Sequence, residues 1–184
     1  MSRRLLRRLL VLAVAATLLA GCWGGSPGSR SQPTQPPSSS AAPSGSHGPF
    51  FPECGGVSDQ TVSQLTGVSG LVVTARNSVG CQWLVAGAII GPWISFSWFR
   101  GSPIGRERKN EERMRSTVTD INLDGHDGFV AVASDPRLGN RLCDVAIRYE
   151  ADFFEWSIQF TRRPDRNLCD VAIELSRRSI AAAK

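Results

Sequence analysis

The sequence has few of the residues that build metal centres and catalytic sites. It contains two histidines, and no two cysteines stand in a CxxC pair. A structural zinc site needs several cysteine or histidine ligands at short spacings, so the pattern disfavours zinc. No segment resembles the strained turn that carries a nucleophilic serine. We therefore expect no cofactor and no enzyme activity.

The folded part of the chain also lacks an excess of basic charge. The formal charge of +5 comes from an N-terminal group and one isolated residue, namely Arg3, Arg4, Arg7, Arg8 and Arg30. From Phe50 onward there are 16 basic and 16 acidic residues. A domain without net charge or a basic run lacks the electrostatic signature of nucleic-acid binding, so we expect no nucleic-acid partner.

No apolar run is long enough for a membrane-spanning helix, which needs about 20 residues. The longest apolar run, residues 9–20, follows four arginines. Its last two residues and the next two form the sequence Leu19-Ala20-Gly21-Cys22. This order is typical of a bacterial lipoprotein signal peptide with its lipobox, and it fits a transmembrane or buried core helix poorly. It predicts that residues 1–21 are removed. Cys22 then carries acyl groups such as palmitate, which attach the protein to the outer face of the cell membrane.

A tether is expected between the lipid and the domain. Residues 23–49 contain eight serines, six prolines and five glycines, with no acidic residue. Such a segment cannot bury enough apolar surface to offset its chain entropy. We therefore predict a lipidated cysteine and disordered tether over residues 22–49 and one folded domain over residues 50–184, which is long enough for a single core.

The domain contains four cysteines, Cys54, Cys81, Cys143 and Cys169. An exported chain meets oxidising conditions, so an even number of cysteines indicates disulfides. Four cysteines allow three pairings, and the two similar short separations favour Cys54–Cys81 and Cys143–Cys169 without excluding the others.

Hydrophobic periodicity predicts an α+β domain. Ser58 is expected to cap a first helix that ends at Gly67. Apolar residues at helical spacing after Pro164 predict a C-terminal helix. Between them, period-2 patterns predict an antiparallel sheet of about six to seven strands that carries both helices on one face. The expected strands are residues 71–75, 81–85, 93–99, 117–123, 129–133, 142–149 and 154–160.

Several segments resemble a broad family of actinobacterial lipoproteins whose domain has no assigned function. Besides the lipobox and the tether, they are residues 48–60 (GPFFPECGGVSDQ), 79–84 (VGCQWL), 100–109 (RGSPIGRERK) and 124–129 (DGHDGF). The resemblance covers the whole mature chain. It implies a cell-envelope lipoprotein, and it supplies neither catalytic residues nor a ligand.

Three polar segments could in principle hold a site. The cluster Asp124-Gly125-His126-Asp127-Gly128 could serve a hydrolase through His126 and Asp127, although aspartate and glycine there also suit a hairpin turn. Glu150, Asp152 and Glu155 fit solvated turn acids better than paired catalytic carboxylates. The charged segment 106–115 mixes both signs, and a solvated helix or an ordered loop is expected there.

The clearest candidate for a binding face lies on residues 93–99. Ile94, Phe96 and Trp98 share one side of this strand and suit a core, whereas Trp93 and Phe99 point to the other side with serines between them. We therefore expect a binding or accessory module that meets a lipid, a small apolar ligand or an envelope protein through Trp93 and Phe99. The alternatives are an envelope hydrolase and a purely structural envelope protein.

Replacing Cys22 with alanine should abolish acylation, because only a thiol at this position accepts the diacylglyceryl group. We expect the variant to lose partitioning into detergent and labelling by a radioactive fatty acid. A variant that still carries lipid would contradict the assignment of the lipobox.

Overall fold

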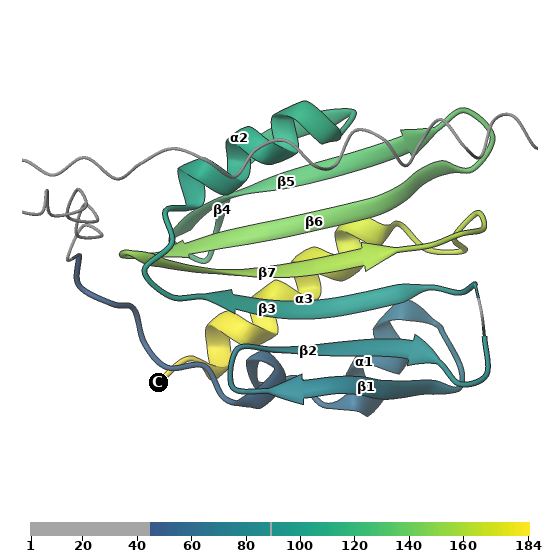
Figure 1. Cartoon of the computed structure of the whole chain (residues 1–184), viewed down its shortest axis with the longest axis horizontal. Helices are drawn as coiled ribbons and strands as arrows, with labels where there is room; N and C mark the ends of the chain where they lie inside the picture. The colour runs from purple at the N-terminus through teal and green to yellow at the C-terminus, as the bar shows by residue number, and fades with distance from the viewer. Residues whose placement is uncertain (1–44, 89) are drawn as a thin grey trace, which may run out of the picture. The chain divides into compact units, whose positions relative to one another are not determined.

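The computed structural model describes residues 45–88 and 90–184 (Figure 1). The predicted signal peptide, Cys22 and most of the predicted tether lie outside these residues. In chain order the elements are the 3-10 turn η1 (Glu53–Gly56), α1 (Asp59–Thr66), β1 (Leu71–Asn77), β2 (Gly80–Val85), β3 (Trp93–Phe99), α2 (Ile104–Met114), β4 (Thr117–Leu123), β5 (His126–Asp135), β6 (Gly139–Tyr149), β7 (Asp152–Gln159) and α3 (Leu168–Ala182).

All seven strands form one antiparallel sheet in the order β1-β2-β3-β7-β6-β5-β4 (Figure 1). Strands β1 to β3 follow one another along the chain, as do β4 to β7. The two groups meet where β3 pairs with β7, from Trp93 opposite Gln159 to Phe99 opposite Phe153. The predicted α+β class and antiparallel sheet are confirmed.

Helices α1 and α3 pack on one face of the sheet, as predicted for the two ends of the domain. Ser58 caps α1 by accepting a hydrogen bond from the backbone N–H of Thr61, and Gly67 ends the helix in a left-handed conformation. The core lies between these helices and the sheet. Its fully buried members include Trp83, Ile94, Val145, Phe154, Trp156, Ile158, Ala172 and Leu175. The apolar positions of α3 thus face the strands, as its helical spacing predicts.

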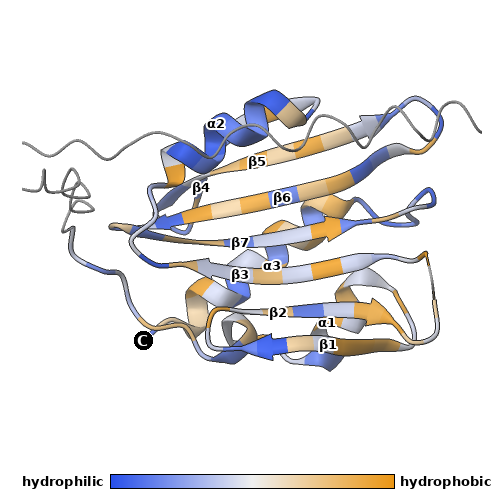
Figure 2. Ribbon diagram, viewed as in Figure 1, coloured by the Kyte–Doolittle hydropathy of each residue, from blue (hydrophilic) through white to orange (hydrophobic). Residues whose placement is uncertain are grey.

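The charged segment that follows β3 forms helix α2. Ile104 at its start packs with Phe129, Ala131, Ala146 and Phe153, which alternate along their strands with residues of the main core. Because successive strand residues point to opposite sides, α2 lies on the second face of the sheet, over β4, β5 and β6. Figure 2 shows this helix as mostly hydrophilic with an apolar first turn.

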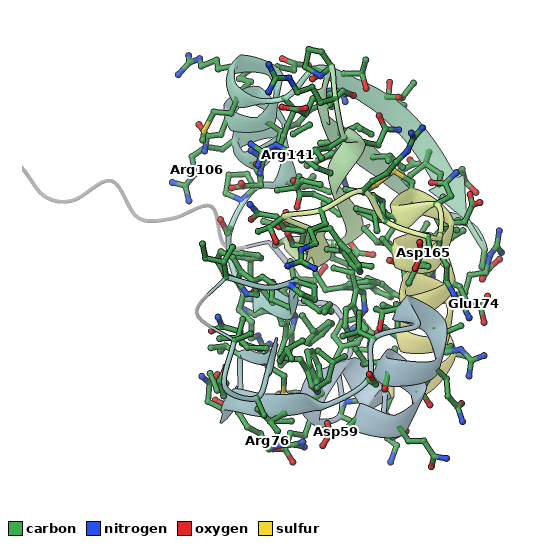
Figure 3. All side chains as sticks on the ribbon, turned by 90° about the vertical axis from the view of Figure 1, so that its right-hand side faces the viewer. Asp59, Arg76, Arg106, Arg141, Asp165 and Glu174 are labelled. Carbon is green, nitrogen blue, oxygen red and sulfur yellow. A yellow bond between two sulfur atoms is a disulfide. The ribbon has the colours of Figure 1, made fainter. Side chains whose placement is uncertain are left out.

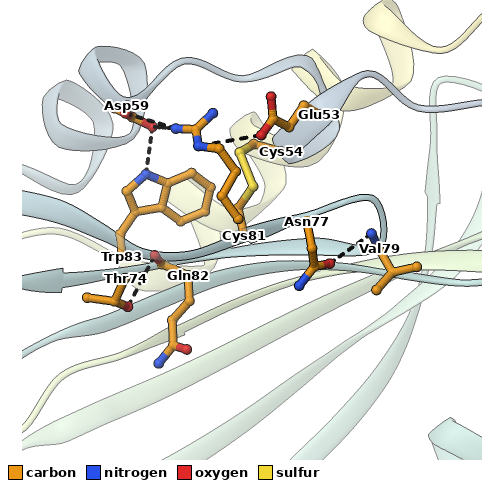
Figure 4. The surroundings of a disulfide bond; sticks show 10 residues. Glu53, Cys54, Asp59, Thr74, Asn77, Val79, Cys81, Gln82 and Trp83 are labelled. Atoms are coloured by element: carbon orange, nitrogen blue, oxygen red, sulfur yellow. Dashed lines mark hydrogen bonds and ion pairs between the residues drawn. A yellow bond between two sulfur atoms is a disulfide. The ribbon is translucent and has the colours of Figure 1, made fainter.

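Both disulfides have the predicted pairing. Cys54–Cys81 joins η1 to β2, and Cys143–Cys169 joins β6 to the first turn of α3. Beside the first bridge, Asp59 accepts hydrogen bonds from the indole Nε1 of Trp83 and from Nη2 of Arg76, both at 2.9 Å (Figure 4). The η1 turn is therefore held to the sheet by a covalent bond, and the start of α1 that follows it is held by polar contacts.

Contacts with the domain begin before Phe50. The backbone N–H of Ala151 donates to the carbonyl of Ser46 at 3.1 Å, and Phe50 exchanges two backbone hydrogen bonds with Lys184. The chain therefore enters the domain at the β6–β7 turn and beside its own C-terminus. Of the helices that the structure describes, none has the length and apolar character needed to span a bilayer.

Replacing Cys143 and Cys169 together with alanine should lower the free energy of unfolding by roughly 3 kcal/mol, because a loop of 26 residues is released in the unfolded state. Urea denaturation of the oxidised proteins measures the difference. The Cys54/Cys81 double variant, which opens a loop of 27 residues, should lose a similar amount. Equal stability of either variant and the wild type would show that the corresponding bridge does not constrain the unfolded chain.

Candidate functional site

Helix α2 covers only part of the second face of the sheet. It contacts β4, β5 and β6, and its first residue Ile104 packs in the cluster that includes Phe99 at the end of β3, whereas Trp93 at the start of β3 lies outside this cluster. On the open part, Val72 lies opposite Leu84 and Leu84 lies opposite Trp93. We call these three residues the Trp93 strip. Trp93 is 47% exposed and Val72 is 43% exposed, so the strip presents apolar surface to solvent.

The two residues of the predicted binding face have different surroundings. Phe99 stacks on Phe153 with ring centroids 4.4 Å apart and packs against the small cluster that contains Ile104 of α2. Trp93 lies at the other end of β3, beyond the cover of α2. The period-2 pattern of β3 predicted that both side chains point away from the main core. It gave no information on where α2 lies, and the packing of Phe99 depends on that position. Phe99 is partly buried, and Trp93 is the more exposed of the two.

A cavity of about 280 Å³ lies beside the Trp93 strip. Its walls come from Leu84 and Trp93 of the strip and from the connection between β2 and β3, where Ile90 is 77% exposed and Pro92 precedes the tryptophan. Gln82 and Gln159 supply its polar groups. A concave, mainly apolar site with a few polar groups is the usual form of a small-molecule site.

The His126 region has the contacts of a tight hairpin. Asp124 and Gly125 both have positive φ angles, 52° and 89°, as a two-residue turn between antiparallel strands requires. The side chain of Asn122 donates to Asp127 Oδ1 at 2.8 Å. The ring of His126 stacks on Tyr149 at 4.1 Å, and burial, with a smaller effect of the charge of Asp124, raises the pKa of Tyr149 to about 12.

In the described part of the chain, His126 has no hydrogen bond to a carboxylate. Asp127, the other member of the suggested acid–base pair, instead accepts a hydrogen bond from the side chain of Asn122 within the hairpin. The residues suggested for a hydrolase are therefore adjacent in sequence, but the structure does not combine them into a catalytic pair.

The interpretation of Asp152 and Glu155 as solvated turn acids was wrong. Strand β7 begins at Asp152, which is 1% exposed, and Glu155 points beneath α2. Asp152 Oδ1 lies 2.8 Å from Nδ1 of His47 and accepts the N–H of Gly101 at 2.8 Å. Burial alone would raise the pKa of Asp152, but these two hydrogen bonds and the nearby charge of Arg100 hold it below its usual range.

A second group of charges under α2 escaped the sequence patterns. Arg115 Nε lies 2.6 Å from Glu111 Oε2 and 2.8 Å from Asp144 Oδ2, and Ser157 donates to Asp144. Burial and then the charge of Asp144 raise the pKa of Glu111 to about 7, although Arg115 opposes the change.

Glu155 completes this group. Its Oε2 is shielded from solvent and has no hydrogen-bond partner among the described residues. Burial, reinforced by the charges of Asp144, Glu107 and Glu111, raises the pKa of Glu155 well above its usual range. The sequence analysis named Glu155 and the charged segment that holds Glu111 and Arg115 separately, and it could not join them with Asp144, because these parts meet only when α2 folds onto the sheet.

Comparison with known proteins assigns the chain to a family. The family model described as "Protein of unknown function (DUF3558)" matches residues 17–182. The chain belongs to this DUF3558 family. Its membership agrees with the resemblance to actinobacterial lipoproteins that the sequence motifs indicated.

Curated relatives of the DUF3558 protein carry the name "Putative lipoprotein LprB". Those of Mycobacterium tuberculosis H37Rv and Mycobacterium bovis are 55% identical over 187 residues and cover 99% of this chain and 100% of their own length. The Mycobacterium leprae protein is 53% identical and covers 97% of this chain and 94% of its own length. These names support a lipoprotein of unknown function and state no enzyme activity.

One solved structure, from Bacteroides thetaiotaomicron, has a TM-score of 0.36 at 12% identity and covers 63% of this chain and 42% of that one.

Replacing Glu155 with glutamine should stabilise the domain near neutral pH. Because the folded-state pKa of Glu155 is raised, the folded protein keeps a proton that the unfolded chain releases above its ordinary pKa of 4.5. Wild-type stability therefore falls as the pH rises above that value, and the variant avoids this loss. We expect the variant to be more stable than the wild type at pH 7.5 and about equally stable at pH 4, measured by urea denaturation.

The matched control is Glu112→Gln on α2, whose side chain is 48% exposed. It should change stability by less than about 0.5 kcal/mol at either pH. A Glu155→Gln variant that is less stable than the wild type at pH 7.5 would indicate an ionised Glu155 that depends on Arg115, contrary to this account.

Proposed function

We propose that the protein is a lipid-anchored binding module of the cell envelope. In this proposal residues 1–21 are removed and acylated Cys22 holds the chain at the outer face of the cell membrane. A tether over residues 22–49 then presents the domain of residues 50–184. The domain acts as an accessory protein that binds an apolar part of a lipid, a small ligand or an envelope protein.

The observation that carries this proposal is the exposed side chain of Trp93 within an apolar row. Folding has covered the corresponding side of β5 and β6 with α2, but it has left Val72, Leu84 and Trp93 facing solvent. Contiguous exposed apolar surface beside a cavity is typical of a binding site, because its burial by a ligand is favourable. A tryptophan offers a large apolar area and an indole N–H that can donate to a polar group.

The name of the relatives supports the anchored location. A lipoprotein exposes its domain close to lipid, so apolar ligands are within reach of the Trp93 strip. Two or more acyl chains attach a protein stably to a membrane, where a single chain gives reversible binding. In this proposal the lipid anchor determines where the protein lies, and the Trp93 strip determines what it binds.

Trp93→Ala tests the binding face. We expect molecules that co-purify with the natively acylated protein in mild detergent, identified by mass spectrometry, to fall several-fold in this variant. Its free energy of unfolding should fall by no more than about 1 kcal/mol, because the residue is already half exposed. Met114→Ala is the matched control, since Met114 is an apolar residue of α2 that is 71% exposed.

Phe99→Ala distinguishes a loss of packing, seen in the stability, from a loss of binding, seen in the co-purified molecules. It removes a stacked ring from the cluster under α2 and should cost about 2–3 kcal/mol, while the co-purified molecules stay the same as long as the domain folds. If Trp93→Ala lowers stability as much as Phe99→Ala and leaves the co-purified molecules unchanged, Trp93 is a packing residue and the proposal fails.

A further inference from the structure

The cavity beside the Trp93 strip continues into a second cavity of about 330 Å³. Both are lined by Val85, Ala88, Ile90, Gly91, Pro92 and Thr161, so they form one groove around the β2–β3 connection. The first part of this groove reaches the Trp93 strip. The second part reaches Arg162 and Arg163, in the connection between β7 and α3. We call the whole feature the Trp93–Arg163 groove.

The two ends of the groove differ in chemistry. At one end Trp93 and Ile90 expose apolar surface. At the other end Arg162 and Arg163 are exposed and form no ion pair with a carboxylate among the described residues, although Asp165 also lines the cavity. Other arginines of the described domain are paired with acids, such as Arg76 with Asp59 and Arg177 with Asp124.

The groove lies far from the place where the tether joins the domain. Residues 46–50 contact the β6–β7 turn, beside Asp152 at the start of β7, whereas Trp93 lies opposite Gln159 at the end of the same strand. Seven residues of extended strand separate the two positions by roughly 23 Å. Figure 1 shows the β2–β3 and β7–α3 connections at the end of the sheet away from this entry, and Figure 3 views that end directly, with Asp165 in the β7–α3 connection.

We propose that the Trp93–Arg163 groove binds one acidic amphiphile, with its apolar chain along Trp93 and Ile90 and its anionic head group at Arg162 and Arg163. This inference rests on the proposed function and names its ligand class. A purely apolar ligand would leave the two arginines without a partner, and a small anion would leave the tryptophan and isoleucine exposed. A molecule with both parts satisfies both ends, because guanidinium groups pair well with phosphate and carboxylate oxygens.

The test uses the non-acylated mature chain, residues 23–184, which keeps every residue that the structure describes. Calorimetric titration compares lysophosphatidylglycerol, lysophosphatidylcholine and glycerol phosphate, with both lysolipids kept below their micelle concentration. We expect the anionic lysolipid to bind about tenfold more tightly than the zwitterionic one, a preference that shrinks with added salt. Glycerol phosphate alone should bind much more weakly than either, since it lacks the apolar part.

Two pairs of substitutions locate the head group. Arg162→Gln combined with Arg163→Gln should remove the preference for the anionic lysolipid and leave the affinity for the zwitterionic one unchanged. The control, Arg106→Gln combined with Arg113→Gln, removes the same charge from α2 and should keep the preference. Trp93→Ala should weaken both lysolipids by a similar factor.

Each of the following outcomes would contradict the proposed acidic amphiphile. Equal affinity for both lysolipids, reduced by Trp93→Ala alone, would overturn the acidic ligand and keep the proposed binding face. Glycerol phosphate binding as tightly as the anionic lysolipid would show a simple anion site. Binding only to vesicles of phosphatidylglycerol and phosphatidylcholine, with no monomer bound, would show adsorption to a membrane surface. Absence of all binding would reject the groove as a lipid site.

Discussion

The pairing of β3 with β7 is the constraint on which the rest of the domain depends. It joins the group β1 to β3 and the group β4 to β7 into one continuous sheet. Its register places Ile94 beside Ile158, Phe96 beside Trp156 and Trp98 beside Phe154, all at most 7% exposed. The stacked rings of Trp83 and Trp156, 5.6 Å apart, extend the same core into β2. Burial of these aromatic side chains is the main favourable contribution to folding at the centre of the sheet.

The same register decides the chemistry of the opposite face. Residues between the core positions point away from α3, so Trp93, Ser95, Ser97 and Phe99 form a second row along β3. Helix α2 covers the Phe99 end of this row and leaves the Trp93 end open. One strand therefore contributes to a buried cluster at its Phe99 end and to an exposed apolar strip at its Trp93 end.

The distribution of charge matters more than its total. Acidic and basic residues are equal in number after Phe50, yet Glu111, Asp144 and Glu155 gather around Arg115 under α2. Oε2 of Glu155 has no hydrogen-bond partner among the residues that the structure describes. Desolvation of a carboxylate favours its neutral form, and three acids beside one guanidinium cannot all be neutralised by it. At the groove the imbalance has the opposite sign, because Arg162 and Arg163 form no ion pair within the described residues and Asp165 is the one acid that lines the same cavity. The net charge of the domain indicated neither the acidic group around Arg115 nor the two arginines of the groove.

The sequence by itself determined the local structure and the covalent links. Period-2 and period-3.6 patterns, the cap at Ser58 and the even number of cysteines are properties of short segments, and they sufficed for the strands, the two outer helices and a favoured disulfide pairing that proved right. Only the tertiary structure decided that α2 lies over β4–β6, that Asp152 is buried, and that Phe99 is covered while Trp93 is not. Each of these depends on contacts between residues far apart in the chain, whose free energy comes from burying surfaces together and leaves no periodic signal in any one segment.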